Sequence, residues 1–316
     1  MNKSIYKTFI LVALISLGHT FAKGQFLKSY EVNELPSTPA DRRIKYGDGP
    51  QQFGDLRIPK SKGPHPVAVV IHGGCWKAQH GPKTADLDNT APLSSALTSV
   101  GIVTWNIEYR STDHPGGGWP GTYDDVAKAL DHLRVLAKSY SLDLDRVVIV
   151  GHSAGGHLGT WAAGRPRLTR TSELFSKHPL PIKGVVNLAG PVDLEHLFTL
   201  RPKACPEGVY STLIGGDVTG PGLQERLSET SPSALLPIGV PQILITGNQD
   251  KSVPPELARS YEEKAKRAGD NVTSKEIENA GHFEVIAPGS VAWPAVEHAV
   301  FSLLGTTKAS AATLDR

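Results

Sequence analysis

The chain has 316 residues, and 39% of them are hydrophobic. It is long enough to bury a full core, and its length suits one large domain better than two small ones. The 33 basic and 31 acidic residues nearly balance, so the composition gives no reason to expect a nucleic-acid partner. We expect a single folded domain over residues 25–305.

The first 24 residues have the pattern of a signal peptide. A basic start with Lys3 and Lys7 is followed by an apolar run over residues 8–17 and by the small residues Ala22 and Gly24, which suit cleavage. The apolar run of about ten residues is well short of the roughly twenty that cross a bilayer, which makes a membrane anchor the weaker interpretation. We therefore expect a secreted or periplasmic protein that has no membrane contact after cleavage.

The strands are predicted from short extended runs. Residues 42–46 and 53–58 flank a turn-rich segment and predict an opening hairpin. The later runs are apolar and rich in β-branched residues, which is typical of strands buried on both faces of a sheet. These runs are residues 67–71, 102–107, 147–150, 184–188 and 242–246, and residues 272–277 predict a last strand.

Stretches with helical spacing lie between the later strands. Because strand and helix alternate, we expect an α/β fold with a mostly parallel sheet. The predicted helices are residues 92–99, 123–139, 156–163, 256–268 and 293–304.

Two segments break this alternation. Residues 191–241 are rich in proline, glycine and polar residues and contain no convincing strand, so we predict an insertion over the active site. Residues 306–316 are small and polar, as in a flexible tail.

The strongest chemical signal is a Gly-x-Ser-x-Gly motif at residues 151–155. The motif alone is common, but here it directly follows a predicted strand and leads into a predicted helix, which is the context of a nucleophile elbow. Larger side chains at Gly151 and Gly155 would collide with neighbouring backbone in such a turn. We predict Ser153 as a nucleophile.

A serine nucleophile needs an imidazole as base and a carboxylate that fixes the imidazole tautomer. Asp250 follows the strand at 242–246, and His282 follows the strand at 272–277. The chain order of Ser153, Asp250 and His282 is the order of α/β-hydrolase triads. Asp193 is the alternative acid, although a pocket or capping role suits it better.

Residues 71–76 lead from the end of another predicted strand into a loop that contains Gly73 and Gly74, whose backbone N–H groups could face an oxyanion. Donors fixed in advance at a developing oxyanion each lower the barrier by roughly 3 kcal/mol. We predict an oxyanion hole formed by Gly73, Gly74 and Ala154. A second glycine-rich run, residues 115–121, lacks a phosphate-binding signature and is predicted to be a shaped loop beside the pocket.

No metal site is expected, because the sequence has neither a His-Glu-x-x-His nor a Cys-x-x-Cys pattern. The two cysteines, Cys75 and Cys205, could pair in an oxidising compartment. Their spacing does not establish proximity, so the pairing stays open.

These motifs resemble those of the esterase branch of the α/β-hydrolases that includes kynurenine formamidase and related carboxylesterases. The resemblance runs from about Tyr46 to Leu304, through the His-Gly-Gly-x-Trp motif at 72–76, the Gly-Gly-Gly-Trp-Pro-Gly run at 116–121 and the Gly-His-Ser-Ala-Gly-Gly-His run at 151–157. It implies an eight-stranded sheet with a cap-like insertion after the sixth strand, and no cofactor. Candidate pocket residues are Trp76, Trp119, His152 and Asp193.

Four functions compete, of which a serine exopeptidase of the prolyl-oligopeptidase kind ranks below the amidase, because such enzymes usually carry a large additional domain for which this chain has no room. The first is a secreted carboxylesterase that acts on esters of small to medium acyl groups through an acyl-enzyme. The second is an amidase of the arylformamidase kind that uses the same triad. A non-catalytic binding protein would require loss of the triad or of the oxyanion glycines, and neither is lost. The oligomeric state and the natural substrate stay open.

Overall fold

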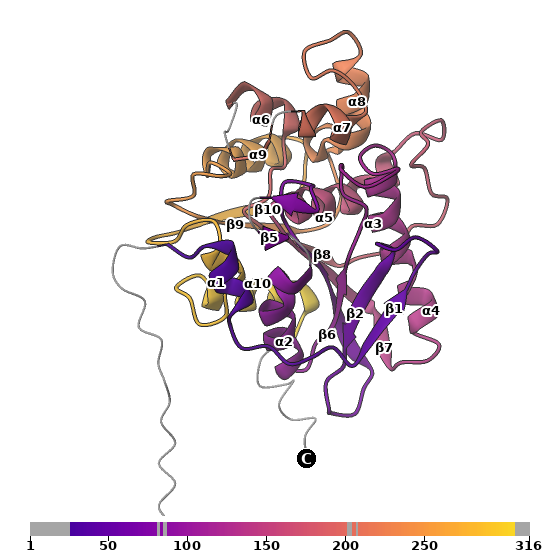
Figure 1. Ribbon diagram of the computed structural model, residues 1–316, viewed down its shortest axis with the longest axis vertical. Coiled ribbons are helices and arrows are strands. Elements are labelled where there is room, and N and C mark those ends of the chain that lie inside the picture. Colours follow the sequence, from indigo (N-terminus) through magenta and orange to yellow (C-terminus); the bar gives the residue numbers. More distant parts are fainter. Residues whose placement is uncertain (1–25, 81–82, 85–86, 201–203, 207, 307–316) are drawn as a thin grey trace, which may run out of the picture.

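The computed structural model describes residues 26–80, 83–84, 87–200, 204–206 and 208–306. The predicted signal peptide and nearly all of the predicted tail lie outside these residues. An eight-stranded sheet forms the centre, and only its β1–β2 and β2–β6 pairings are antiparallel (Figure 1). The order across the sheet is β1 (Arg42–Lys45), β2 (Phe53–Arg57), β6 (Val103–Ile107), β3 (His65–Ile71), β7 (Leu142–His152), β8 (Gly184–Leu188), β9 (Gln242–Gly247) and β10 (Val272–Ile277).

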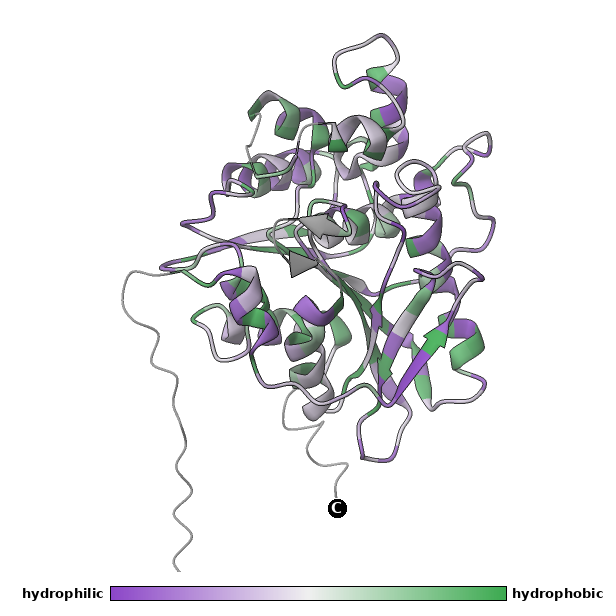
Figure 2. Ribbon diagram, in the orientation of Figure 1, coloured by the Kyte–Doolittle hydropathy of each residue, from purple (hydrophilic) through white to green (hydrophobic). Residues whose placement is uncertain are grey.

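Helices cover both faces of the sheet, which explains why the central strands are continuously apolar. Side chains alternate between the faces: Val67 and Val69 of β3 belong to one core cluster, and Ala68 and Val70 to another. The first face carries α3 (Gly121–Asp131), α5 (Ala154–Gly164) and α9 (Glu256–Arg267), and the second carries α2 (Ala91–Ser99) and α10 (Trp293–Leu304). Figure 2 shows hydrophobic residues along the central strands and mostly hydrophilic residues on the edge strand β1.

Two predicted elements differ in extent. The helix predicted at 123–139 is divided by His132 into α3 and α4 (Leu133–Leu136), although Leu133 and Leu136 stay buried against the same core. The strand predicted at 147–150 extends to 142–152 as β7, because its first residues also pair with β3.

Several short elements have no counterpart in the prediction. They are α1 (Ser29–Asn33), β4 (Gln79–His80), β5 (Lys83–Thr84), η1 (Leu87–Thr90), η2 (Arg165–Arg167) and η4 (Glu284–Ile286).

The described part of the chain contains no helix long and apolar enough to cross a membrane.

The segment predicted as an insertion, residues 191–241, contains helices joined by turns and loops in the part that the structure describes. Its helices gather at one end of the molecule together with α9 (Figure 1). They are α6 (Leu194–Leu200), α7 (Val209–Ile214), α8 (Leu223–Thr230) and η3 (Pro232–Leu235).

Candidate active site

Ser153 occupies a sharp turn between the end of β7 and the start of α5. Its φ of 51° and ψ of −119° are strained values for a residue with a side chain. The turn needs its glycines: a Cβ at Gly151 would lie 2.2 Å from the Gly155 carbonyl oxygen, and a Cβ at Gly155 would lie 2.2 Å from the Ile71 oxygen. This confirms the steric reason given for both glycines, and the turn is a nucleophile elbow.

Asp250 and His282 meet at the carboxyl edge of the sheet, each in the loop that follows its strand. The His282 Nδ1 atom lies 2.6 Å from Asp250 Oδ2. The other oxygen of Asp250 accepts hydrogen bonds from the backbone N–H groups of Ser252 at 2.7 Å and Val253 at 3.0 Å. The carboxylate is therefore fixed on both oxygens, and the imidazole is oriented by it.

His152 holds the His282 loop from the elbow side. Its Nε2 atom lies 3.0 Å from the His282 carbonyl oxygen, and because a carbonyl can only accept, Nε2 carries the hydrogen. The two rings lie 4.8 Å apart between centroids. Burial lowers the pKa of His152 well below its usual value, and the nearby His282 lowers it further. His152 is therefore neutral when it makes this contact.

The predicted oxyanion loop lies directly against the elbow. A Cβ at Gly73 would approach Ser153 Cβ to 2.9 Å, and Gly74 has a φ of 110°, which favours glycine. His72 supports the loop through contacts of 2.8 Å to the Gly73 carbonyl oxygen and 3.0 Å to Glu108. The loop is thus rigidly backed where it meets Ser153.

Cys75 and Cys205 form a disulfide with Cα atoms 5.5 Å apart. The bridge joins the loop that carries Gly73 and Gly74 to the 191–241 segment across 130 residues of chain. The sequence left this pairing open, and the structure settles it.

Trp76 anchors the loop that carries Gly73 and Gly74. Its Nε1–H donates to His157 Nδ1 at 3.1 Å, and His157 Nε2–H donates to the Thr230 carbonyl oxygen at 2.8 Å. Burial lowers the pKa of His157 to about 4, so the ring is neutral and can both donate and accept. This chain of bonds joins the loop to α5 and α8.

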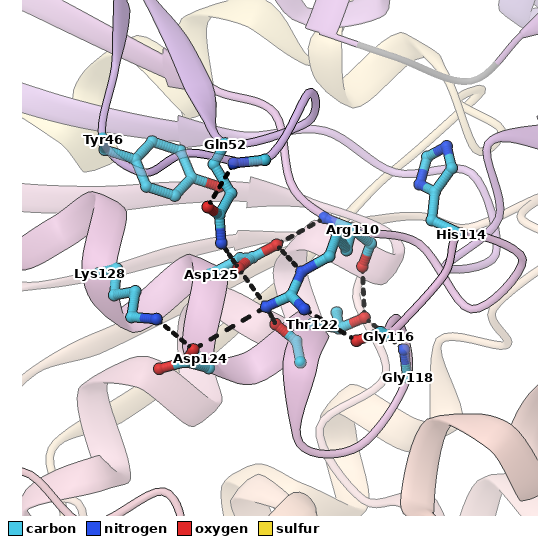
Figure 3. Close-up of polar contacts among 12 residues, drawn as sticks. Tyr46, Gln52, Arg110, His114, Gly116, Gly118, Thr122, Asp124, Asp125 and Lys128 are labelled. Atoms are coloured by element: carbon cyan, nitrogen blue, oxygen red, sulfur yellow. Dashed lines mark hydrogen bonds and ion pairs between the residues drawn. The ribbon is translucent and has the colours of Figure 1, made fainter.

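The loop at 115–121 is held by Arg110, as Figure 3 shows. The guanidinium group donates to both oxygens of Asp125, at 2.7 and 2.8 Å, and to the carbonyl oxygens of Gly116 and Gly121, each at 3.2 Å. Thr122 adds a hydrogen bond to the Arg110 carbonyl oxygen. Arg110 therefore closes this loop onto the start of α3.

Trp119 projects from that loop toward the insertion. The Arg226 guanidinium lies 4.5 Å from the centre of its ring, and Gly215 packs on the ring face. The Trp119 backbone N–H donates to the Thr212 carbonyl oxygen at 3.1 Å. These contacts attach the loop to α7 and α8.

The Asp193 carboxylate contacts His196 and Lys264, whereas the carboxylate on His282 is that of Asp250. One of its carboxylate oxygens accepts the His196 N–H at 3.2 Å in the first turn of α6, and the other lies 3.2 Å from Lys264 Nζ. This geometry is that of a helix cap paired with a lysine of α9.

A cavity of about 210 Å³ contains Ser153 and His282. Of the four candidate pocket residues, His152 lines it, whereas Trp76, Trp119 and Asp193 are not among its lining residues, because their side chains are used in the contacts above. The sequence missed much of its wall, since lining residues such as Tyr30, Asn89 and Ala204 belong to no motif. The remaining lining residues are Ser29, Tyr30, Gly74, Cys75, Asn89, Ala204, Cys205, Ser252, Val253 and Phe283.

A larger cleft of about 500 Å³ lies elsewhere, between Thr38, Arg57 and Gly101. It contains none of the predicted catalytic residues, so the smaller cavity is the candidate active site.

The order and direction of the eight strands, with an elbow after β7 and acid and histidine loops after β9 and β10, define an α/β-hydrolase. The chain belongs to the BD-FAE family, whose model matches residues 55–265.

Curated relatives carry esterase names. The chain is 28% identical to esterase LipC of Mycobacterium tuberculosis over 278 residues, which cover 86% of this chain and 66% of LipC. It is 28% identical to the probable carboxylic ester hydrolase LipM of the same organism, over 63% of this chain and 44% of LipM. The chain thus spans less than two thirds of the length of these relatives.

Solved structures share the fold. Esterase B from Lactobacillus rhamnosis has a TM-score of 0.69 and 20% identity, over 90% of this chain and 92% of that one. A truncated carbohydrate esterase from gut microbiota has a TM-score of 0.68 and 19% identity, over 85% of this chain and 99% of that one.

Proposed function

We propose that this protein is a serine carboxylesterase with Ser153 as nucleophile, His282 as base and Asp250 as the acid. The observation that carries the proposal is the 2.6 Å contact between His282 and Asp250, with His282 opening into the same cavity as a serine on a strained elbow. The esterase names of the relatives support the same chemistry.

In this mechanism the Ser153 hydroxyl attacks the ester carbonyl carbon while His282 Nε2 takes its proton. Asp250 holds Nδ1–H and stabilises the imidazolium. The N–H groups of Gly73, Gly74 and Ala154 are the proposed donors to the oxyanion. When the tetrahedral intermediate collapses, His282 returns the proton to the leaving alcohol, and an acyl-enzyme remains. Water, activated by His282, then releases the acid.

The small cavity supports substrates with small to medium acyl groups. Its volume of about 210 Å³ lies below the roughly 300 Å³ at which drug-sized ligand pockets begin. The bonded residues Cys75 and Cys205 both line this cavity, so the covalent bridge limits its expansion on that side.

We also propose that the protein is exported. Disulfides persist in oxidising compartments, and Cys75 and Cys205 are paired. This agrees with the basic and apolar start of the chain. N-terminal sequencing of the mature protein from a cell envelope or culture fraction tests it, and a first residue still at Met1 contradicts it.

A substrate panel tests the proposed activity. We expect p-nitrophenyl acetate and butyrate to be hydrolysed by the wild type and not measurably by Ser153→Ala, because loss of a triad nucleophile costs about 10⁶-fold in kcat. Full activity in Ser153→Ala would disprove the nucleophile. N-formylkynurenine is the amide arm of the panel: preferential turnover of it identifies an arylformamidase instead.

A further inference from the structure

The segment at residues 26–33, here called the N-terminal arm, forms part of the active-site wall. It contains α1, which packs beside η1 and α2 (Figure 1). Ser29 and Tyr30 line the cavity that contains Ser153 and His282. Tyr30 is 38% exposed, so its ring lies at the border between the cavity and solvent. The arm therefore contacts the space that a substrate would occupy.

Glu284 joins the arm to the loop that carries His282. Its Oε1 accepts the Leu27 backbone N–H at 2.6 Å, and its Oε2 accepts the Gly281 backbone N–H at 2.8 Å. The carboxylate is buried, with 7% exposure. One oxygen thus holds the arm and the other holds the residue directly before His282.

Two further residues fix the arm, Asn89 through hydrogen bonds and Val32 through burial. Asn89 Nδ2 donates to the Ser29 carbonyl oxygen at 3.0 Å and to Asn33 Oδ1 at 2.7 Å. Val32 is fully buried in the core on this face of the sheet. The arm is therefore packed into the domain, and these contacts hold its C-terminal end independently of Glu284.

We propose, on the basis of the esterase activity proposed above, that the N-terminal arm is the wall that selects the leaving alcohol and that Glu284 is a positioning residue for His282. The carboxylate fixes the His282 loop and the arm as one unit. Tyr30, carried on that unit, is the specificity-determining side chain.

The alcohol side follows from the direction of proton transfer. His282 delivers its proton to the leaving oxygen, so the alcohol leaves beside the imidazole. The cavity surfaces tied to the His282 loop include Phe283, which is adjacent in sequence, His152, which binds the His282 carbonyl oxygen, and the arm, which Glu284 connects. These surfaces meet the alcohol, whereas the acyl group extends toward other parts of the wall.

Tyr30→Ala tests the wall with two ester series, one of acetates with different alcohols and one of p-nitrophenyl esters with different acyl chains. We expect relative kcat/KM across the alcohol series to change by about tenfold and the ranking of acyl chains to stay as in the wild type. Tyr30→Phe retains the ring and should retain wild-type selectivity. A change confined to the acyl series would overturn the assignment.

The acyl-enzyme gives a second readout for Tyr30, because the alcohol has already left at that stage. We expect Tyr30→Ala to change the burst phase of acylation and to leave the deacylation rate unchanged. A changed deacylation rate contradicts an alcohol-side role.

Glu284→Gln and Leu27→Pro test the positioning role, since each removes part of the same contact. Proline has no N–H to donate, and Leu27→Ala keeps the N–H while it removes the side chain. We expect kcat to fall about tenfold in Glu284→Gln and Leu27→Pro, with both acylation and deacylation slowed and KM nearly unchanged, because His282 acts in both steps. Leu27→Ala should stay near the wild type.

Glu31→Gln is the matched control, because the Glu31 carboxylate accepts a backbone N–H within the arm, that of Lys28. Wild-type kcat in Glu284→Gln at a temperature well below its melting point would reduce Glu284 to a structural role and overturn the proposal.

Labelling of Ser153 by a small alkyl fluorophosphonate separates this proposal from the proposed function. If no ester is turned over but labelling is slowed in Glu284→Gln relative to Glu31→Gln, the esterase assignment fails and the positioning role stands. If esters are turned over and the labelling rates are equal, the positioning role fails and the esterase assignment stands.

Discussion

Two glycine-rich loops, at residues 72–76 and 115–121, look alike in sequence and differ in the structure. Gly73 and Gly74 lie at the elbow, next to Ser153. The second loop contributes no residue to the wall of the cavity around Ser153. Its glycines allow backbone segments to pack closely, and Arg110 holds the loop in place by hydrogen bonds. Glycine thus lets one loop lie directly against the Ser153 turn and lets the other pack tightly onto neighbouring backbone.

Gly117→Ala should break the second loop and have the largest effect on stability. An alanine Cβ there would lie 1.8 Å from the Ser111 carbonyl oxygen and 2.7 Å from its carbon, and backbone atoms cannot yield cheaply. We expect a loss of about 4 kcal/mol of unfolding free energy. Thermal and urea unfolding measure it. Melting within a few degrees of the wild type would show that the loop can move aside.

Gly73→Ala should instead affect catalysis. Its Cβ would press against Ser153 Cβ and His152 Nδ1, each at 2.9 Å. We expect kcat to fall about a hundredfold, as when one oxyanion donor is displaced, with a smaller effect on melting. Gly164→Ala, at the other end of α5, is the control for the same exchange. A Gly73→Ala enzyme with wild-type kcat would remove Gly73 from the proposed machinery.

His157, which supports the loop at residues 72–76, predicts a pH dependence of the unfolding free energy. Burial lowers the pKa of His157 from 6.5 to about 4, so between these values the unfolded chain binds a proton that the folded chain does not. This contribution is fully present above pH 6.5 and is lost as the pH falls toward 4, by about 3 kcal/mol in total.

Urea unfolding from pH 7 to pH 4 checks this dependence. His157→Gln should be less stable than the wild type at pH 7 and should lose less stability on acidification. The exposed His178→Gln variant should follow the wild-type curve. Equal slopes for His157→Gln and the wild type would contradict the assignment.

Trp119→Leu gives the smallest expected effect and sharpens the same contrast. It removes the contact between the indole ring and Arg226. We expect a loss of about 1 kcal/mol of unfolding free energy and kcat/KM within about twofold of the wild type. A large change in acyl preference would return Trp119 to the pocket.

Local patterns in the sequence predicted the sheet and the proximity of Asp250 and His282. β-branched runs marked each central strand, and β10 (Val272–Ile277) has the predicted bounds. Asp250 and His282 could be placed together because parallel strands end at one edge of a sheet, and the structure brings them into contact.

The cavity wall could not be predicted, because it depends on contacts between distant segments. No motif marks the N-terminal arm, whose link to Glu284 uses the backbone N–H of Leu27. Trp119 resembled a pocket residue because of its loop, but Arg226 and Gly215 surround its ring. Pairing of Cys75 with Cys205 likewise depends on how the chain folds over 130 residues.

The bridge between Cys75 and Cys205 has a consequence for how the enzyme matures. Both partners line the cavity, one on the loop beside Ser153 and the other on the helical insertion. In a reducing cell interior the two thiols stay reduced, and this side of the cavity lacks its covalent tie. The bond can close only after more than a hundred intervening residues have been synthesised, so oxidation is a late step that completes the substrate chamber.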